Sequence, residues 1–154
     1  MGWITSASDS QALLPGIFAL RDEFAAEGIT RFVLCGMGGS SLAPEVITKN
    51  AGVDLVVLDS TAPDQVAAAL IHLDKTAVIV SSKSGSTVET DSQKRAFETA
   101  FKAAGINPTE RIVIVTDPGS PLDVASREAG YRVFNADPNV GGRYSALTAF
   151  GLVP

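Results

Sequence analysis

Five short runs of apolar and mostly β-branched residues recur along the chain, with helical segments between them. The runs span residues 31–35, 53–58, 77–81, 111–116 and 131–134. Each run is nearly continuous in apolar residues, which is typical of strands that are covered on both faces. Strands that alternate with helices of this length indicate parallel βαβ units, so the pattern predicts a fold of the α/β class.

The segments that separate these runs have the spacing of helices. Helices are predicted over residues 13–28, 44–51, 62–73, 87–105 and 120–130. In the longest, Phe97, Phe101 and Ala104 fall on one face, and Gly105 ends the helix. We expect a three-layer α/β/α fold whose five-stranded parallel sheet has the flavodoxin-like order 2-1-3-4-5, because right-handed crossovers leave few alternatives.

Composition and charge exclude several classes of protein. Apolar residues make up 45% of the chain and charged residues 19%, which is a globular composition. The net charge of −5, without a basic stripe, argues against nucleic-acid binding. No apolar run approaches the roughly 18 to 20 residues that span a bilayer. No cluster of metal-ligating residues occurs in the sequence, so neither a metal nor another cofactor is expected.

The single cysteine, Cys35, closes the first apolar run and cannot form a disulfide within the chain. We expect it to be a small buried hydrophobic residue. An unpaired cysteine fits a reducing compartment, so the sequence predicts a soluble cytoplasmic domain.

Two loops of glycine and hydroxyl residues follow the first and third predicted strands. Residues 36–41 read GMGGSS, and residues 82–87 read SKSGST. In the order 2-1-3-4-5 these two strands border the point where the strand order reverses, which is where open α/β sheets bind ligands. By contrast, Asp59 and Asp117 begin Asp/Pro turns after the second and fourth strands, and turn formation explains them. The sequence therefore predicts a binding site between the two glycine-containing loops.

The chemistry of these loops suits a phosphate group. Glycines let a ligand approach the backbone, and the free N–H groups at the start of a helix attract anions. Hydroxyl groups add neutral donors, so such a cradle needs little formal charge. The first loop is neither the dinucleotide pattern G-x-G-x-x-G nor a Walker loop.

Helix capping is an alternative explanation for each loop. Ser86 and Glu89 have the spacing of a capping box, and Ser41 is placed to cap a helix with Pro44 in its first turn. Either loop alone is explained as well by capping as by anion binding. The two together, at adjacent strand ends, favour a binding site.

A third candidate segment, NVGGRYSALTAFG at 139–151, follows the last predicted strand. Gly141 and Gly142 form a turn into a helix, and Arg143 lies at its beginning. On local grounds Arg143 is either a surface residue or a cation directed at an anionic substrate or intermediate. The only histidine, His72, is expected on the surface at the opposite, amino end of the sheet.

Taken together, GMGGSSLAPEV, SSKSGSTVET and VGGRYSALTAFGL resemble the sugar-phosphate-binding half of glucose-6-phosphate isomerases, in the sugar isomerase (SIS) superfamily. The pattern S-x-S-G-x-T is general to the superfamily, whereas VGGRYS is more particular to the isomerases. The first loop is similar to bacterial isomerases, including those fused to a transaldolase. The resemblance extends from about Trp3 to the end of the chain.

The resemblance implies the roles of individual residues in the interconversion of glucose 6-phosphate and fructose 6-phosphate. The implied substrate-binding residues are Gly39, Ser40, Ser82, Lys83 through its backbone, Ser84, Thr87 and Glu89. The first two of these would contact the sugar, Glu89 would support the sugar chain, and the others would hold the 6-phosphate. Arg143 would be catalytic and would stabilise the negative charge of the enediolate.

The sequence departs from the family pattern in two respects. Gly85 and Val88 stand where the isomerases have an aromatic residue and a glutamine, which alters the shape of the pocket. The family's glutamate base, its histidine from a partner subunit and its ring-opening lysine all come from later segments, which have no counterpart in the 154 residues. We therefore expect residues 1–154 to be a single SIS domain, a fragment of a longer isomerase that binds its substrate without turning it over.

The partners expected on this basis are a sugar phosphate, a missing C-terminal SIS subdomain and further copies of the chain in a homo-oligomer. Neither nucleic acid nor a membrane is expected as a partner. One alternative is a stand-alone SIS module that senses a sugar phosphate, although a sensor has no need of Arg143. A weaker alternative is a nucleotide-binding flavodoxin-like domain, and the lack of aromatic residues in the two loops argues against it.

Overall fold

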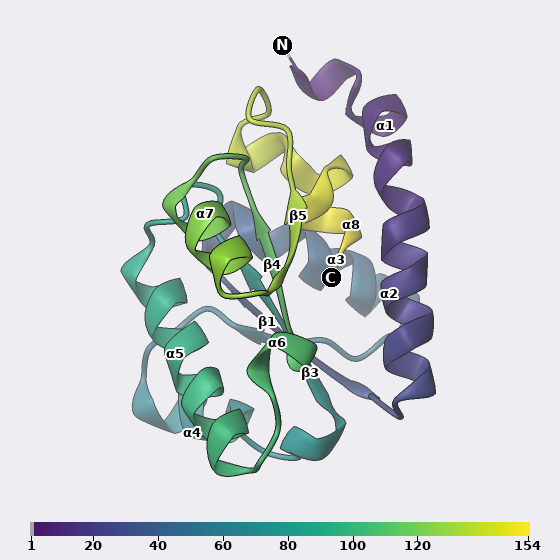
Figure 1. Ribbon diagram of the computed structural model, residues 1–154. Helices are drawn as coiled ribbons and strands as arrows, with labels where there is room; N and C mark the ends of the chain where they lie inside the picture. Colours follow the sequence, from purple (N-terminus) through teal and green to yellow (C-terminus); the bar gives the residue numbers. More distant parts are fainter. Residues whose placement is uncertain (1) are drawn as a thin grey trace.

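A computed structural model describes residues 2–154, and its centre is a parallel five-stranded sheet (Figure 1). The strands are β1 Arg31–Gly36, β2 Val56–Leu58, β3 Thr76–Ser81, β4 Ile112–Thr116 and β5 Arg132–Asn135. Their order is β2-β1-β3-β4-β5, and all neighbouring pairs are parallel. The predicted fold class and strand order are confirmed. The second strand is shorter than predicted, because its pairing with β1 begins only at Val56.

Helices connect successive strands and precede the first. The α-helices are α1 Ser6–Asp9, α2 Leu14–Ala26, α3 Leu42–Ala51, α4 Pro63–Ala69, α5 Val88–Ala103, α6 Pro108–Arg111, α7 Pro121–Glu128 and α8 Ala149–Leu152. Short 3₁₀ helices are η1 Gly2–Ile4, η2 Ser10–Leu13, η3 Gly38–Ser40, η4 Leu73–Lys75 and η5 Gly142–Leu147. Within residues 2–154 no helix is both long and apolar enough to cross a membrane.

Two helix ends differ from the sequence prediction. The helix predicted over 62–73 stops at Ala69, because Leu70 already leaves the helical conformation with ψ 33° and His72 then adopts a left-handed one with φ 51°. The predicted position of Ala104 on the buried face of α5 is also wrong, since α5 ends at Ala103 and Ala104 is exposed. Phe97 and Phe101 are fully buried on that face, as predicted.

The helices cover both faces of the sheet, with α4, α5 and α7 on one face and α2 and α8 on the other (Figure 1). Side chains alternate along each strand, so Val33 and Cys35 pack toward α5 whereas Leu34 packs toward α8. Cys35 is fully buried, as predicted, and burial raises the pKa of its thiol. The sheet is therefore a rigid platform for the loops at its carboxyl end.

Candidate functional site

The two glycine-containing loops leave the sheet side by side. Gly36, the last residue of β1, is in register with Ser81, the last residue of β3. Because the strands are parallel neighbours, the loops 37–41 and 82–87 start at the same edge of the sheet. His72 is exposed in the connection that leads into the start of β3, at the opposite edge, as predicted. The predicted binding edge therefore exists in the structure.

In the second loop the hydroxyl groups bond to one another and leave the helix uncapped. The Ser82 hydroxyl donates to Thr87 Oγ1 at 3.2 Å, and the Ser86 hydroxyl donates to Ser84 Oγ at 3.0 Å. Helix α5 begins after Thr87, and no side chain caps its first N–H groups. The capping box predicted as an alternative, between Ser86 and Glu89, is therefore wrong. Uncapped N–H groups beside hydroxyl donors are free to bind an anion.

The first loop is also not a helix cap. The Ser41 hydroxyl donates to the carbonyl of Gly38 at 3.2 Å, within its own loop. Helix α3 starts after Ser41 without a side-chain cap. Gly39 and Ser40 are half-buried in the same turn. The capping alternative therefore fails for both loops, and their polar groups are available for another purpose.

The third segment packs directly on the first loop. A Cβ atom at Gly39 would lie 2.7 Å from the carbonyl oxygen of Gly142. The Ser145 hydroxyl donates to that carbonyl at 2.7 Å and lies 3.4 Å from the carbonyl of Gly39. Arg143 is exposed in the first turn of η5, and with Gly39 it lines a cavity of about 680 Å³ beside α3. The structure thus brings the predicted sugar-contacting loop and the predicted catalytic cation to one cavity.

The phosphate-loop residues line a separate and much smaller cavity. Ser82 and Thr87 surround a space of about 20 Å³ together with Thr90 and Leu122. The hydroxyl of Thr90 is buried there and has no hydrogen-bond partner among the described residues. Four of the eight predicted site residues therefore line two separate hollows, and the other four, Ser40, Lys83, Ser84 and Glu89, line neither.

Lys83 and Glu89 are two of the predicted residues that line neither hollow. The Lys83 ammonium lies 2.6 Å from Asp117 Oδ2, on the side of β4, so only its backbone faces the loop. Glu89 is exposed on the first turn of α5 and makes no side-chain hydrogen bond within residues 2–154. Sequence reasoning missed Asp117, which it explained as a turn residue. The available signal was that Lys83 and Asp117 both follow neighbouring strands.

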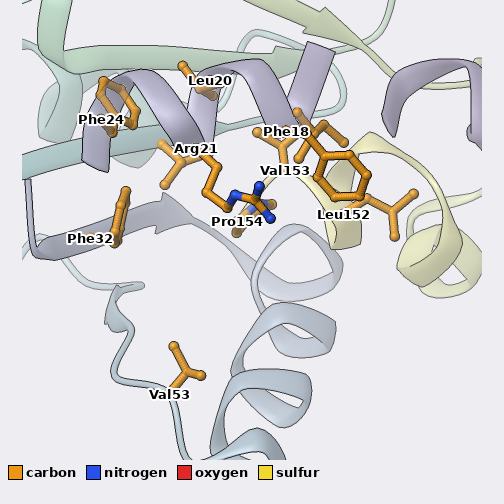
Figure 2. Close-up of a pocket in the computed structure, with 11 residues that line it drawn as sticks. Phe18, Leu20, Arg21, Phe24, Phe32, Val53, Leu152, Val153 and Pro154 are labelled. Atoms are coloured by element: carbon orange, nitrogen blue, oxygen red, sulfur yellow. The ribbon is translucent and has the colours of Figure 1, made fainter. Parts of the chain in front are cut away.

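A further cavity, of about 330 Å³, lies between α2 and the sheet (Figure 2). Figure 2 shows Phe24 and Phe32 at one end and Phe18 and Leu152 at the other, with Arg21 between them. Its lining is almost wholly apolar, and the Arg21 guanidinium pairs with the neighbouring aspartate. The cavity beside α3 is nearly as apolar, so the location decides: the cavity under α2 does not lie at the carboxyl ends of the strands, where open α/β sheets bind ligands. It is not the candidate site.

Comparison with known proteins identifies the family. The family described as phosphoglucose isomerase matches residues 21–154, which is most of the chain. The chain belongs to the phosphoglucose isomerase family. The resemblance seen in the three sequence segments is therefore confirmed. Within residues 2–154 no three metal-ligating side chains gather into a cluster.

Individual members of the family agree with this assignment. A glucose-6-phosphate isomerase from Thermus thermophilus is 35% identical over the whole chain. The structure of a hypothetical protein from the same species covers 99% of the chain with a TM-score of 0.88 and 33% identity. A glucose-6-phosphate isomerase structure from Chlamydia trachomatis covers 89% with a TM-score of 0.78 and 30% identity. The chain spans only 38% of the Thermus enzyme and 28% of the Chlamydia structure.

Proposed function

We propose that this chain is the sugar-phosphate-binding part of an enzyme that interconverts glucose 6-phosphate and fructose 6-phosphate through an enediolate. The glucose-6-phosphate isomerases compared above are at least two and a half times as long as this chain, since the chain spans at most 38% of their length. In the proposal, the complete enzyme also contains a second SIS subdomain, works as a homo-oligomer and resides in the cytoplasm. The buried, unpaired Cys35 agrees with a reducing compartment.

The 6-phosphate is assigned to the second loop. Its donors are the hydroxyls of Ser82, Ser84 and Thr87, the backbone N–H of Lys83 and the uncapped N–H groups of α5. All of these donors are neutral, and the positive end of the α5 dipole adds to their attraction for an anion. The observation that carries the proposal is that neither glycine-containing loop uses its hydroxyls for capping.

The reacting end of the sugar is assigned to the first and third segments. Gly39, which Ser40 follows in the same turn, lines the cavity that Arg143 also lines, so a sugar held there meets a guanidinium. Isomerisation removes a proton from C2 of the aldose and returns one to C1, and the intermediate carries negative charge on oxygen. A fixed cation lowers the energy of that charge, which is the role we assign to Arg143.

A base for this proton transfer is not assigned to any described residue. Glu89 is exposed, Asp91 pairs with Arg95 at 3.0 Å, and Asp117 pairs with Lys83 at 2.6 Å. We therefore expect residues 2–154 to bind a sugar phosphate without converting it. A module that only senses a sugar phosphate would also bind it without converting it. Arg143 favours the enzyme, because a sensor does not need a cation that stabilises an enediolate.

Thermal unfolding tests the binding part of the proposal. Fructose 6-phosphate at about 100 times its dissociation constant should stabilise the chain by roughly 2.7 kcal/mol. Fructose and inorganic phosphate, each lacking half of the ligand, should shift the unfolding temperature less. Ser84→Ala and Thr87→Ala should abolish the shift, whereas Thr99→Ala, which removes a hydroxyl on the outer surface of α5, should keep it. If fructose 6-phosphate at millimolar concentration shifts nothing, the proposal for this chain fails.

A further inference from the structure

A partly buried ion pair lies against the phosphate loop on the side of β4. The Lys83 ammonium is 2.6 Å from Asp117 Oδ2, and the two side chains are only 28% and 19% exposed. The same ammonium lies 3.5 Å from the backbone carbonyl of Asp137, beyond the end of β5. The backbones of the pair are also joined, because the Asp117 N–H donates to the Lys83 carbonyl at 3.4 Å. Lys83 thus joins the second loop to the end of β4 through two interactions with Asp117, a side-chain ion pair and a backbone hydrogen bond.

Neighbouring bonds extend this attachment along the loop. The Ser82 N–H donates to the carbonyl of Val115 at 3.0 Å, and the Thr116 hydroxyl donates to the carbonyl of Ser82 at 2.7 Å. Further along, a Cβ at Gly85 would lie 2.8 Å from Ser120 Oγ. The end of β4 therefore supports the loop at its first residue, and the turn after β4 supports it at its second and fourth. The Ser82 and Thr87 hydroxyls bond to each other, and these residues line the small cavity with Thr90 of α5.

The ion pair is not explained by stability alone. An exposed ion pair contributes about 0–1 kcal/mol, and burial of both groups adds a desolvation cost. Asp117 Oδ1 is moreover buried without a hydrogen-bond partner in the part of the chain that the structure describes, which is itself unfavourable. What the carboxylate does achieve is geometric, since it holds the Lys83 side chain toward β4 and β5 and away from the loop's hydroxyls.

We propose that Lys83 and Asp117 are positioning residues that fix the backbone of the phosphate loop in its binding conformation, and that the ammonium itself does not bind the phosphate. The inference rests on the proposed function, and it identifies which residues preorganise that site. A loop already held in its binding conformation loses less conformational freedom when the ligand binds, so the pair raises affinity. The aspartate that follows β4 is therefore part of the site although it does not touch the ligand.

Amide hydrogen exchange in the ligand-free chain tests the positioning directly. Lys83→Met and Asp117→Asn should each raise the exchange rate of the amides of residues 83–87 and leave β3 and β4 protected. Lys94→Met is the matched control, because it breaks a similarly buried ion pair with Glu98 on α5, away from the loop. Unchanged exchange at 83–87 in both loop variants would overturn the proposal, whether or not the chain binds a sugar phosphate.

Calorimetric titration with fructose 6-phosphate then separates positioning from direct contact. Each loop variant should bind about tenfold more weakly, and the double variant should bind no more weakly than either single one, because contacting residues are coupled. If Asp117→Asn binds as well as the unaltered chain while Lys83→Met does not, the ammonium is itself a ligand and the proposal is wrong. If both variants bind like the unaltered chain and only unfold more easily, the pair is merely structural. If the unaltered chain does not bind, the proposed function fails, and the exchange result still decides the positioning.

Discussion

Gly39 and Gly142 are packed so closely that no side chain fits between them, since a Cβ at Gly39 would be 2.7 Å from the Gly142 carbonyl oxygen. The same Cβ would be 3.5 Å from the backbone nitrogen of Arg143. The position of Arg143, the candidate catalytic residue, thus depends on the lack of a side chain at Gly39, about a hundred residues earlier in the sequence.

Gly39→Ala should separate the first loop from η5. We expect the free energy of unfolding to fall by about 1–3 kcal/mol, which is typical of overpacking. Gly142→Ala is the control, because a Cβ there meets nothing within 4 Å. Urea denaturation of both variants checks the prediction, and equal stability of the two would contradict it.

Gly85→Ala should distort the phosphate loop for two reasons. Gly85 has φ +66°, a conformation that costs an L-residue roughly 1–2 kcal/mol, and its Cβ would also lie 2.9 Å from Leu122. Gly119→Ala has a similar φ of +72° with open space around the Cβ, so it isolates the conformational cost. Denaturant unfolding should show Gly85→Ala to be the less stable of the two. A Gly119→Ala variant that is equally destabilised would mean that the contact with Leu122 is unimportant.

Arg143→Gln should leave stability unchanged and weaken the binding of an anionic intermediate. Arg143 is exposed and makes no side-chain hydrogen bond within residues 2–154, so the free energy of unfolding should change by less than about 0.5 kcal/mol. A phosphorylated aldonic acid carries a carboxylate where the enediolate carries its charge. Titration calorimetry should show that this ligand binds at least about tenfold more weakly to the variant, the loss typical of a charge-assisted hydrogen bond. Equal weakening of fructose 6-phosphate would indicate a general effect on the pocket and would count against the assigned role.

Asp123 should make stability depend on pH. Its carboxylate accepts hydrogen bonds from the Gly119 N–H at 2.8 Å, from Arg127 at 2.7 Å and from Asn135 at 3.2 Å. The bond from Gly119 is the largest cause of a lowered pKa in the folded chain, and the side chains of Asn135 and Arg127 lower it further against the opposing effect of burial. A carboxyl group whose pKa is lower in the folded state stabilises the fold above its unfolded pKa of about 3.9 and loses that contribution as the pH falls through the folded value.

Asp123→Asn should therefore be less stable than the unaltered chain at pH 7, and the difference should shrink as the pH falls below about 4. Urea unfolding across this range gives the difference at each pH. A difference that stays constant with pH would show that the carboxylate charge contributes nothing to the folded state.

Much of the fold could be predicted from the sequence, because buried parallel strands are continuous apolar runs and right-handed crossovers fix their order. The helix ends could not. The helix before β3 stops at Ala69, because Leu70 is no longer helical and His72 takes a left-handed conformation, which is rare for a residue other than glycine and leaves no mark in the sequence. Ala104 had the right spacing for the buried face of α5, but the helix ends one residue before it.

The candidate site was partly predictable for a similar reason. The two glycine-containing loops could be brought together because they follow neighbouring parallel strands. The Lys83–Asp117 pair could not, since both residues have adequate local explanations and their contact depends on side-chain direction across two strands. The close approach of Gly39 and Gly142 likewise joins segments that only the folded chain places together.

The burial of Cys35 makes the rate of its chemical modification a measure of how often the domain unfolds. This thiol is the chain's only one and lies with no exposed surface in β1, between β2 and β3 and against α5. A thiol reagent in solution reaches it only when the sheet and that helix separate, because burial also keeps the thiol protonated and unreactive. The labelling rate of Cys35, measured without any engineered probe, therefore reports how often the whole domain opens. A ligand that binds the loops at the edge of the sheet would lower this rate.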